Sequence, residues 1–320
     1  TGAAGIQVFR ANPPKMLPLI KAWLVDNLID AKSHLESFNE KTKGLAFENT
    51  YRLHLALLNN LHKKRETALN IFEKTLKTGA NDKIRHLYFY YYLVSNSEKN
   101  NEILNLFLAD NPDHSFNIYA KKNNVDDYKI EKRKDGISES FFNIAEILYG
   151  QRMHDSSIAF SYLSLYLNNK NYINYYLIAQ NLLILGKEIE AAKALKNIPL
   201  KSYIGWSSHL KLVDLNVSIG NHEIAEEYIL KLNSFSPNRV DVYYKLGELK
   251  HNQKDYKQAI IAFNRSISFQ KENSEKDWYL FYSRGMAYER SKKWDAAEKD
   301  FLKALELSPS QPLVLNYLGY

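Results

Sequence analysis

The sequence predicts an all-α protein in which antiparallel helix pairs stack side by side. Three observations predict this fold. The 320 residues include only 12 Gly and 8 Pro, so few positions break a helix and the connections are expected to be short. Small residues recur at a nearly constant spacing inside apolar helical patterns. Further small residues, and then large apolar ones, follow each of them at fixed distances.

The spacing of the small residues defines the repeat. They lie 34 residues apart, with one step of 38, at Ala145, Ala179, Val213, Gly247, Gly285 and Gly319. Twelve residues after each of the first five comes a second small side chain, at Ser157, Ala191, Ala225, Ala259 and Ala297. Sixteen residues after comes a side chain that is mostly large and apolar, at Ser161, Leu195, Ile229, Phe263 and Phe301. Two antiparallel helices approach closely only where both carry small side chains, and a large apolar residue one turn on fills the remaining groove.

The ends of the repeats carry turn and cap signals. The longer step contains the polar insert 271–276, where a turn between repeats tolerates extra residues. Pro237 and Pro309 stop helices at the ends of their repeats. Asp255 and, one period earlier, Asn221 are predicted to cap the second helices, because their side chains can accept bonds from free backbone N–H groups.

These segments resemble the tetratricopeptide repeat, most clearly through Tyr243, Leu246, Gly247, Ala259 and Phe263 and through Gly285, Tyr288, Ala297, Phe301, Ala304 and Pro309. The resemblance implies a right-handed superhelical solenoid of antiparallel helix pairs, in which the first helix of each pair lines a concave groove that binds a protein partner. It divides an array at 138–320 into repeats near 138–171, 172–205, 206–239, 240–277 and 278–311, with an incomplete repeat at 312–320.

Residues 1–112 are predicted to form degenerate helical repeats. Part of this segment keeps the spacing of twelve and then four residues, at Ala56, Ala68 and Phe72. Elsewhere the pattern is weaker, and Tyr90 stands where a small residue is expected. Residues 113–137 break the period and are predicted to be an irregular connecting segment. Its basic run, 129–136, is predicted to be a solvated loop.

The end of the chain resembles longer bacterial proteins with many such repeats, whose biochemical role is poorly defined. The similarity covers 278–289 and 294–320. Pro312 opens the first helix of a further repeat. We therefore expect the chain to be a fragment, with further contacts made through that last helix. The resemblance leaves the bacterial periplasm or envelope and the cytoplasm open as compartments, and the oligomeric state stays open too.

The sequence shows no recognisable chemistry of catalysis or cofactor binding. It has no Cys, which excludes disulfides, thiolate metal sites and cysteine nucleophiles. Phosphate-binding glycine motifs are absent, and the nine His residues show no metal-ligand spacing. Ser208 and Lys211 match an S-x-x-K spacing, but the motifs that accompany it in enzymes are missing. We predict no catalytic residue, cofactor or metal; no apolar run is long enough to span a bilayer.

The first helix of each repeat is predicted to present two rows of side chains to a partner. Three residues before each small position lie apolar or aromatic residues, at Phe142, Tyr176, Leu210, Tyr244 and Tyr282. One residue after it lie mostly acidic ones, at Glu146, Gln180, Asp214, Glu248 and Met286. The two positions are four residues apart and so share one helix face. This surface suits an amphipathic helix or extended peptide that carries apolar anchors and Lys or Arg.

Other interpretations of these rows stay open. The aromatic row can serve internal packing, because a tightly wound superhelix buries its own inner wall, and the rows can arise by chance. Groove positions occupied by Asp, Glu and Tyr disfavour the carboxylate clamp of chaperone-binding repeats, which needs Lys, Asn and Arg.

The alternative function is a nucleic-acid-binding helical repeat. The net charge is +7, and most of the excess lies in residues 1–137. Residues 88–92 are five consecutive aromatics that cannot all face one core. One or two of them are expected at the surface or against another helix pair, where base stacking is one possible role.

Overall fold

The computed structural model describes residues 13–42, 47–78, 83–95, 102–111, 114–121, 128–270 and 274–318. Within these ranges every regular element is a helix, which confirms the predicted all-α class. The α-helices are α1 (Pro13–Leu24), α2 (Leu28–Lys41), α3 (Glu48–Leu61), α4 (Arg65–Leu76), α5 (Ile84–Val94), α6 (Glu102–Asp110), α7 (Ser115–Lys121), α8 (Arg133–Gly150), α9 (His154–Leu167), α10 (Ile173–Ile184), α11 (Glu188–Lys196), α12 (Gly205–Ser218), α13 (His222–Phe235), α14 (Val240–Asn252), α15 (Tyr256–Ser268), α16 (Trp278–Arg290), α17 (Trp294–Leu307) and α18 (Pro312–Leu318). A short 3-10 helix, η1 (Glu275–Asp277), precedes α16. Gly319 and insert residues 271–273 lie outside the described residues.

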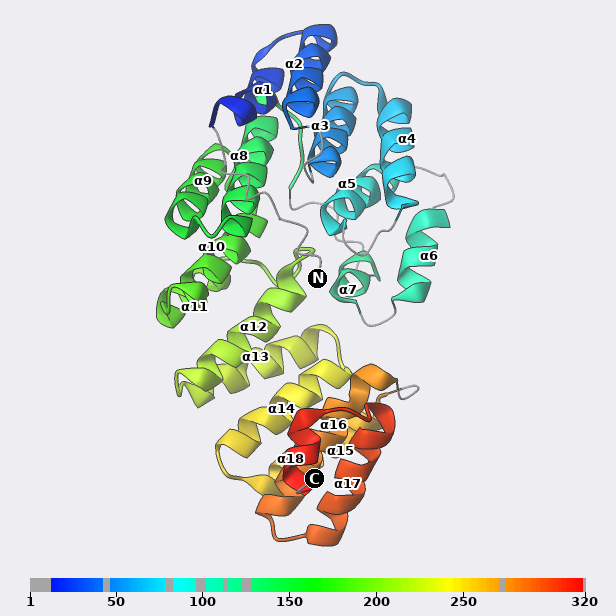
Figure 1. Cartoon of the computed structure of the whole chain (residues 1–320), viewed down its shortest axis with the longest axis vertical. Helices are drawn as coiled ribbons and strands as arrows, with labels where there is room; N and C mark the ends of the chain where they lie inside the picture. The colour runs from blue at the N-terminus through cyan, green and yellow to red at the C-terminus, as the bar shows by residue number, and fades with distance from the viewer. Residues whose placement is uncertain are drawn as a thin grey trace, which may run out of the picture. The chain divides into compact units, whose positions relative to one another are not determined.

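The chain divides into two compact units, unit 1 within residues 1–206 and unit 2 within 207–320. Each unit is built from antiparallel helix pairs joined by short turns (Figure 1). Unit 1 contains α1/α2, α3/α4, α8/α9 and α10/α11, and unit 2 contains α12/α13, α14/α15 and α16/α17, followed by α18. The five pairs from α8/α9 to α16/α17 lie within residues 133–307. The predicted connecting segment, 113–137, lies inside unit 1.

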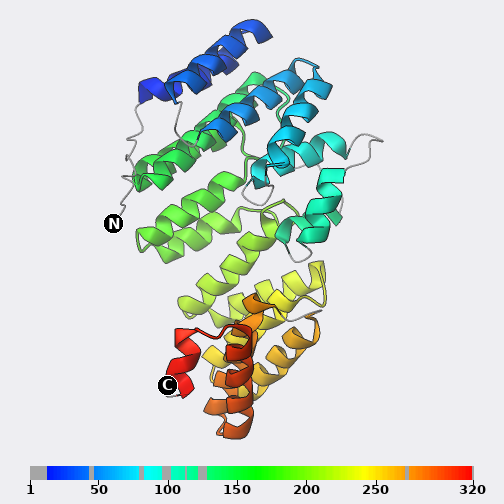
Figure 2. The same cartoon turned by 45° about the vertical axis from the view of Figure 1, so that its right-hand side comes forward.

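Helix α8 has neighbours that its sequence position does not suggest. It packs on α9, which follows it, but also on α1 and α3 (Figures 1 and 2). The closest approach to α1 is at Gly136, where an added Cβ atom would lie 2.0 Å from Cε3 of Trp23. Trp23 is fully buried. A glycine is therefore required at this crossing, because any side chain would overlap the indole.

The basic run 129–136 is only partly the solvated loop that the sequence predicted: residues 131–134 are exposed, but the helix begins within the run. Its last four residues, from Arg133 to Gly136, form the first turn of α8. Asp135 is buried, and one of its carboxylate oxygens accepts the backbone N–H groups of Glu131 and Lys132 at 3.1 Å and 2.8 Å. The prediction missed this turn because the run of exposed charges also contains the start of a helix, where the buried Asp135 satisfies free N–H groups.

The turns inside six of the seven helix pairs, all except α1/α2, share a backbone feature. Seven residues after each small position, the chain enters the left-handed region, with φ values from 60° to 81°, at Lys63, Arg152, Gly186, Gly220, Lys254 and Lys292. Glycine adopts this conformation without steric cost, whereas residues with a side chain do not. Four of the six residues nevertheless are Lys or Arg. Lys63 lies between α3 and α4, so the degenerate pair predicted from Ala56 has the same turn as the clear repeats.

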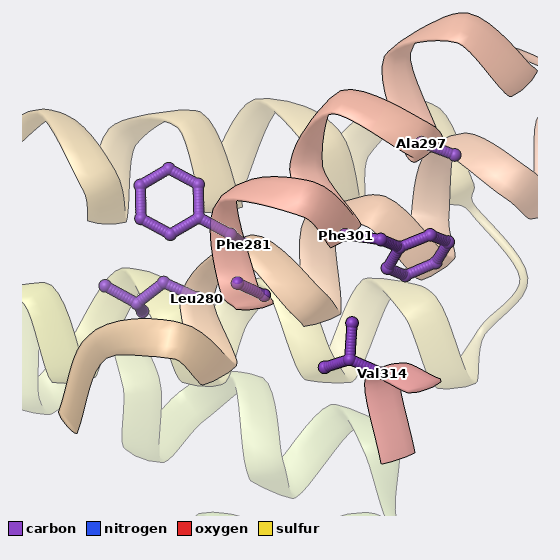
Figure 3. Packing of buried hydrophobic residues seen from close by; sticks show 6 residues of the cluster. Leu280, Phe281, Ala297, Phe301 and Val314 are labelled. Carbon is purple, nitrogen blue, oxygen red and sulfur yellow. The ribbon is translucent and has the colours of Figure 1, made fainter. Parts of the chain in front are cut away.

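Unit 2 shows why small residues recur in the first helices. A Cβ atom on Gly247 would lie 2.4 Å from the ring of Phe263, and one on Gly285 would lie 2.8 Å from the ring of Phe301. These are the predicted partners sixteen residues on. Figure 3 shows Phe301 within the buried cluster of this last pair and α18, together with Leu280, Phe281, Ala297 and Val314.

In the first clear repeat, buried serines replace the apolar residues of the pattern. Ser157 Oγ donates to the carbonyl oxygen of Ala145 at 2.8 Å, and Ser161 Oγ donates to that of Ser157 at 2.9 Å. Asn181 Nδ2 on the next pair donates to Ser157 Oγ at 3.0 Å. Hydrogen bonds thus hold α8, α9 and α10 together where the other repeats use Ala and a large apolar residue.

One of the two predicted caps is present. The side chain of Asp255 accepts the backbone N–H of Gln258 at 3.1 Å and caps α15. Asn221 stands at the equivalent place before α13 but makes no cap hydrogen bond with its side chain.

Candidate partner-binding site

The acidic row of unit 2 surrounds a lysine that sequence reasoning missed. Lys245 Nζ lies 2.7 Å from Asp214 Oδ1 and 2.7 Å from Glu248 Oε2, so one cation bridges carboxylates on α12 and α14. The three side chains line a pocket of about 330 Å³, together with Val213, Val217, Ser218 and Asn252. We call this the unit 2 pocket. Its signal in the sequence is the spacing of three residues between Lys245 and Glu248, which places both on one helix face.

The bridge leaves an acidic surface toward solvent. The side chains of Asp214 and Glu248 are 39% and 34% exposed, whereas that of Lys245 is 19% exposed. The two carboxylates raise the pKa of Lys245 against the effect of desolvation, which lowers it. The lysine therefore stays charged, and the pocket carries two negative charges against one positive charge.

The predicted aromatic row of unit 2 packs partly within the unit. Tyr244 is half-buried; its hydroxyl lies 3.2 Å from Ser283 Oγ and its ring meets Tyr279 edge-on at 4.8 Å. Desolvation, with the nearby Glu248 carboxylate, raises the pKa of Tyr244. Tyr282 contacts Tyr317 of α18 at 5.7 Å, edge to face, and the rings of Trp278 and Phe301. Leu210 on α12 and Met286 on α16 are also half-buried.

The predicted residues of unit 1 lie in different environments. Phe142 is buried, with the guanidinium carbon of Arg85 5.2 Å from its ring centre. Glu146, one turn further along α8, is open to solvent. Tyr176 and Gln180 are half-buried on α10, where desolvation raises the pKa of Tyr176 and a hydrogen bond from Gln180 lowers it.

Arg85 on α5 forms a buried ion pair with Glu139 on α8. Its Nε donates to Glu139 Oε1 at 2.8 Å, and a second, shorter bond joins the other oxygen, so the contact is bidentate. Two more bonds hold the guanidinium, to the Tyr203 hydroxyl at 2.7 Å and to Asn171 Oδ1 at 2.9 Å. Glu139 is fully buried. The pair therefore joins a degenerate N-terminal helix to the first clear repeat.

Five aromatic rings surround the Arg85 guanidinium. Their centres lie 4.9 to 5.7 Å from its central carbon, and they belong to Tyr88, Phe89, Tyr128, Phe142 and Tyr203. The aromatic run 88–92 is thus mostly interior: four of its rings are buried and Tyr92 alone is partly exposed. The rings that base stacking would require are largely inaccessible, because α5 is packed on nearly all sides.

A directed chain of hydrogen bonds leads from the core to Glu146. Trp23 Nε1 can only donate, and it lies 2.9 Å from His54 Nδ1, so the proton of His54 is on Nε2. That nitrogen lies 2.7 Å from Asn143 Oδ1, and Asn143 Nδ2 donates to Glu146 Oε2 at 3.1 Å. Burial lowers the pKa of His54, which keeps the ring neutral. The chain fixes the orientation of each side chain along it.

Glu146 opens into a pocket of about 290 Å³, called the unit 1 pocket, which α3, α5, α8 and α10 enclose. Both polar and apolar side chains line it, from Asn49, Thr50, Leu53, Lys83, Ile84, Arg85, His86, Phe142, Asn143, Glu146, Ile173 and Tyr203. The signal for this site in the sequence was a stripe on one face of α8, at Glu139, Phe142, Asn143 and Glu146.

Replacing Glu146 by Gln is expected to stabilise unit 1 at pH 8. Desolvation, followed by repulsion from Glu139, raises the pKa of Glu146 to about 7, against the opposing effects of Asn143 and Arg85. Above pH 7 the Glu146 carboxylate is charged in both the folded and the unfolded protein, and its charge is less favourable in the folded protein. As the pH falls toward 4.5, the folded protein takes up the proton before the unfolded protein does, which removes this penalty. The advantage of Gln should therefore shrink between pH 8 and pH 5.

The measurement is urea unfolding of both proteins at several pH values. Gln still accepts the Asn143 bond, and the buried histidines titrate alike in both proteins, so they cancel in the difference. Because Glu146 is open to solvent, the gain should stay below about 1.4 kcal/mol per pKa unit. A stability difference that does not change with pH would contradict the assignment.

The described residues contain no group of three or more acidic or His side chains arranged to hold a metal ion. None of the helices of the described segments has the length and apolarity needed to cross a membrane.

The sequence matches models of the tetratricopeptide repeat over residues 240–273 and 278–311. Among curated proteins, none matches the sequence. Solved structures of similar fold include PilW, described as a type IV pilus biogenesis factor, with 12% identity over 84% of this chain and 98% of that chain and a TM-score of 0.49. They also include a MamA protein, with 22% identity over 54% and 92% and a TM-score of 0.46. A third is YrrB, described as a repeat protein with an unusual peptide-binding site, with 16% identity over 65% and 99% and a TM-score of 0.45.

The two matched segments coincide with α14/α15 and α16/α17, where Gly247 and Gly285 receive their phenylalanine partners. The same backbone turn recurs in four further pairs. The chain therefore carries tetratricopeptide repeats over residues 240–273 and 278–311.

Proposed function

We propose that the chain is a non-catalytic scaffold that binds a protein partner on the first-helix face of unit 2, formed by α12, α14 and α16. The partner presents a peptide or helix with basic and apolar side chains. The single observation that carries this proposal is the unit 2 pocket, in which the two carboxylates are more exposed than the lysine between them. A partner Arg or Lys would meet the acidic surface first, and a guanidinium could bind a carboxylate with two hydrogen bonds.

Apolar contacts are available next to this charge. Tyr244 is half-buried beside Lys245, and Met286 and Tyr282 are half-buried on α16. Partly exposed aromatic side chains are frequent anchors of binding energy at protein interfaces. No comparable observation favours nucleic acid, since most rings of the 88–92 run are buried.

The test selects ligands from a random-peptide display library on the full chain. We expect the selected peptides to be enriched in Arg or Lys beside an apolar residue. The double variant Asp214→Asn, Glu248→Gln should then bind the best peptide about tenfold more weakly or worse, because it loses charge-assisted bonds. Alanine at Tyr244 or Tyr282 would be a poorer test, since both rings also pack within the unit.

The control variant is Glu227→Gln, Glu298→Gln, which changes the net charge by the same amount at exposed positions on second helices, α13 and α17. It should bind the peptide like the unmodified chain. Selection of acidic peptides, or equal loss of binding in both double variants, would show that the proposed surface is not the binding site.

A further inference from the structure

The unit 1 pocket contains a buried hydroxyl group with a proton that finds no acceptor. Tyr203 is 5% exposed and lines the pocket, and Arg85 Nη1 donates to its oxygen at 2.7 Å. Burial raises the pKa of Tyr203 to about 12, so the phenol keeps its proton at neutral pH. Within the described part of the chain, no side chain or backbone oxygen accepts a hydrogen bond from this O–H. A buried O–H group without an acceptor destabilises the fold, and a bound group that accepts its hydrogen bond would remove this cost.

A carboxylate with spare acceptor capacity lies on the same pocket. The only hydrogen bond to Glu146 among the described residues comes from Asn143, at 3.1 Å, whereas a carboxylate can accept about four. No cation of the described segments forms an ion pair with it. Arg85 is already bound by both oxygens of Glu139. Above pH 7, where it has lost its proton, Glu146 is therefore an anion on the pocket wall that no cation of the described residues pairs with.

A positive charge lines another part of the pocket wall. Lys83, at the start of α5, is 7% exposed and close enough to His86 to lower the pKa of that ring, after the larger effect of desolvation. Its Nζ donates to Thr78 Oγ1 at 3.3 Å and, among the described residues, makes no ion pair with Glu146. The ammonium of Lys83 and the carboxylate of Glu146 thus lie at separate places, with the apolar side chains of Leu53 and Ile173 also on the wall.

We propose that the unit 1 pocket binds a small zwitterion, a free α-amino acid being the simplest case. The ligand ammonium binds Glu146, and the ligand carboxylate accepts the O–H of Tyr203 and faces Lys83. An apolar ligand side chain packs on Phe142, Leu53 and Ile173. The volume of about 290 Å³ is at the lower edge of the range for pockets that hold drug-sized molecules, which suits a ligand of this size. This inference concerns residues of unit 1 alone and does not depend on the proposed function.

The experiment is isothermal calorimetry and thermal shift on the full chain with each of the common L-amino acids at millimolar concentration. We expect an apolar amino acid to bind and to raise the melting temperature. Its deaminated acid and its decarboxylated amine should each bind about tenfold more weakly or worse, because each lacks one of the charged groups. Glu146→Gln and Tyr203→Phe should weaken binding of the intact amino acid by a similar factor.

Two matched variants serve as controls: Glu190→Gln on α11 and Tyr166→Phe on α9, both at exposed positions of unit 1. They should leave binding unchanged. Glu146→Gln keeps the Asn143 bond, so it tests the site even if Tyr203→Phe destabilises the fold through Arg85. Absence of binding by every amino acid, equal binding of the deaminated acid, or unchanged binding in Glu146→Gln would overturn the proposal.

Discussion

Replacing Arg85 by Met is expected to lower the unfolding free energy of unit 1 by about 3–5 kcal/mol, because it leaves the Glu139 carboxylate buried without a counter-ion. The substitution also removes the donors to Tyr203 and Asn171. A loss of this size is a large part of the roughly 5–15 kcal/mol that stabilises a typical domain. Urea unfolding followed by circular dichroism measures the loss, and hydrogen exchange of α5 and α8 amides assigns it to unit 1.

The control is Arg52→Met, which breaks the exposed ion pair with Glu48 on α3. That pair spans one helical turn at the surface and should contribute about 0.5 kcal/mol or less. A second variant, Arg85→Met with Glu139→Leu, should recover part of the lost stability, because no uncompensated charge is left in the core. If Arg85→Met cost no more than Arg52→Met, the ion pair would not be holding unit 1 together.

Gly136→Ala is expected to destabilise unit 1 by about 3 kcal/mol, near the upper end of the usual cost of overpacking. The new methyl group would overlap the indole of Trp23, which is fully buried and bonded to His54, so the ring cannot move aside without breaking that bond. Urea unfolding measures the loss. A change in tryptophan fluorescence should accompany it, because the surroundings of Trp23 change.

The same helix provides the control. Gly150, at the other end of α8, has open space where a Cβ atom would be placed, so Gly150→Ala should be neutral or slightly stabilising through its higher helix propensity. Adding Trp23→Leu to Gly136→Ala should relieve the overlap and recover part of the unfolding free energy that Gly136→Ala loses. Equal unfolding midpoints for the two Gly→Ala variants would show that α1 does not press on α8 in solution.

The helix pairs of the array could be predicted because their packing rule is local. Gly247 and Phe263 are sixteen residues apart and meet across one turn, so the requirement for a small and a large partner is visible within a single repeat. The same holds for Gly285 and Phe301. Each repeat imposes this condition again, and the period therefore survives changes at other positions.

The interior of unit 1 could not be predicted in this way. Arg85 and Glu139 are 54 residues apart, and their contact depends on how the degenerate helices return to α8. The aromatic run misled for the same reason: a helix with rings on every side is predicted to expose some of them, but α5 lies between several neighbours and buries four of the five. In the sequence, the stripe of Glu139, Phe142, Asn143 and Glu146 on α8 is the signal from which a polar partner of this face could have been inferred.

The two candidate sites differ in the same way: part of the unit 2 pocket could be predicted from the sequence repeat, whereas contacts between distant residues could not. The rows of unit 2 followed from the period, so the positions of Asp214 and Glu248 on a common pocket were accessible to sequence reasoning. Lys245 was not, because it falls outside both rows and its effect comes from a side chain that reaches across to α12. The partner-binding role of the ten predicted groove residues remains a proposal for the selection experiment to test.

The left-handed residue in the turns of six helix pairs offers a way to assign repeat boundaries when side chains have diverged. Between α3 and α4 the turn at Lys63 has the geometry of those at Lys254 and Lys292, although the surrounding sequence has lost most of the family pattern. Backbone conformation at one position is constrained by chain closure, whereas surface and core side chains can drift together over evolutionary time. Homologues of this chain could therefore be aligned by that turn, and the ancestry of their degenerate pairs traced from it.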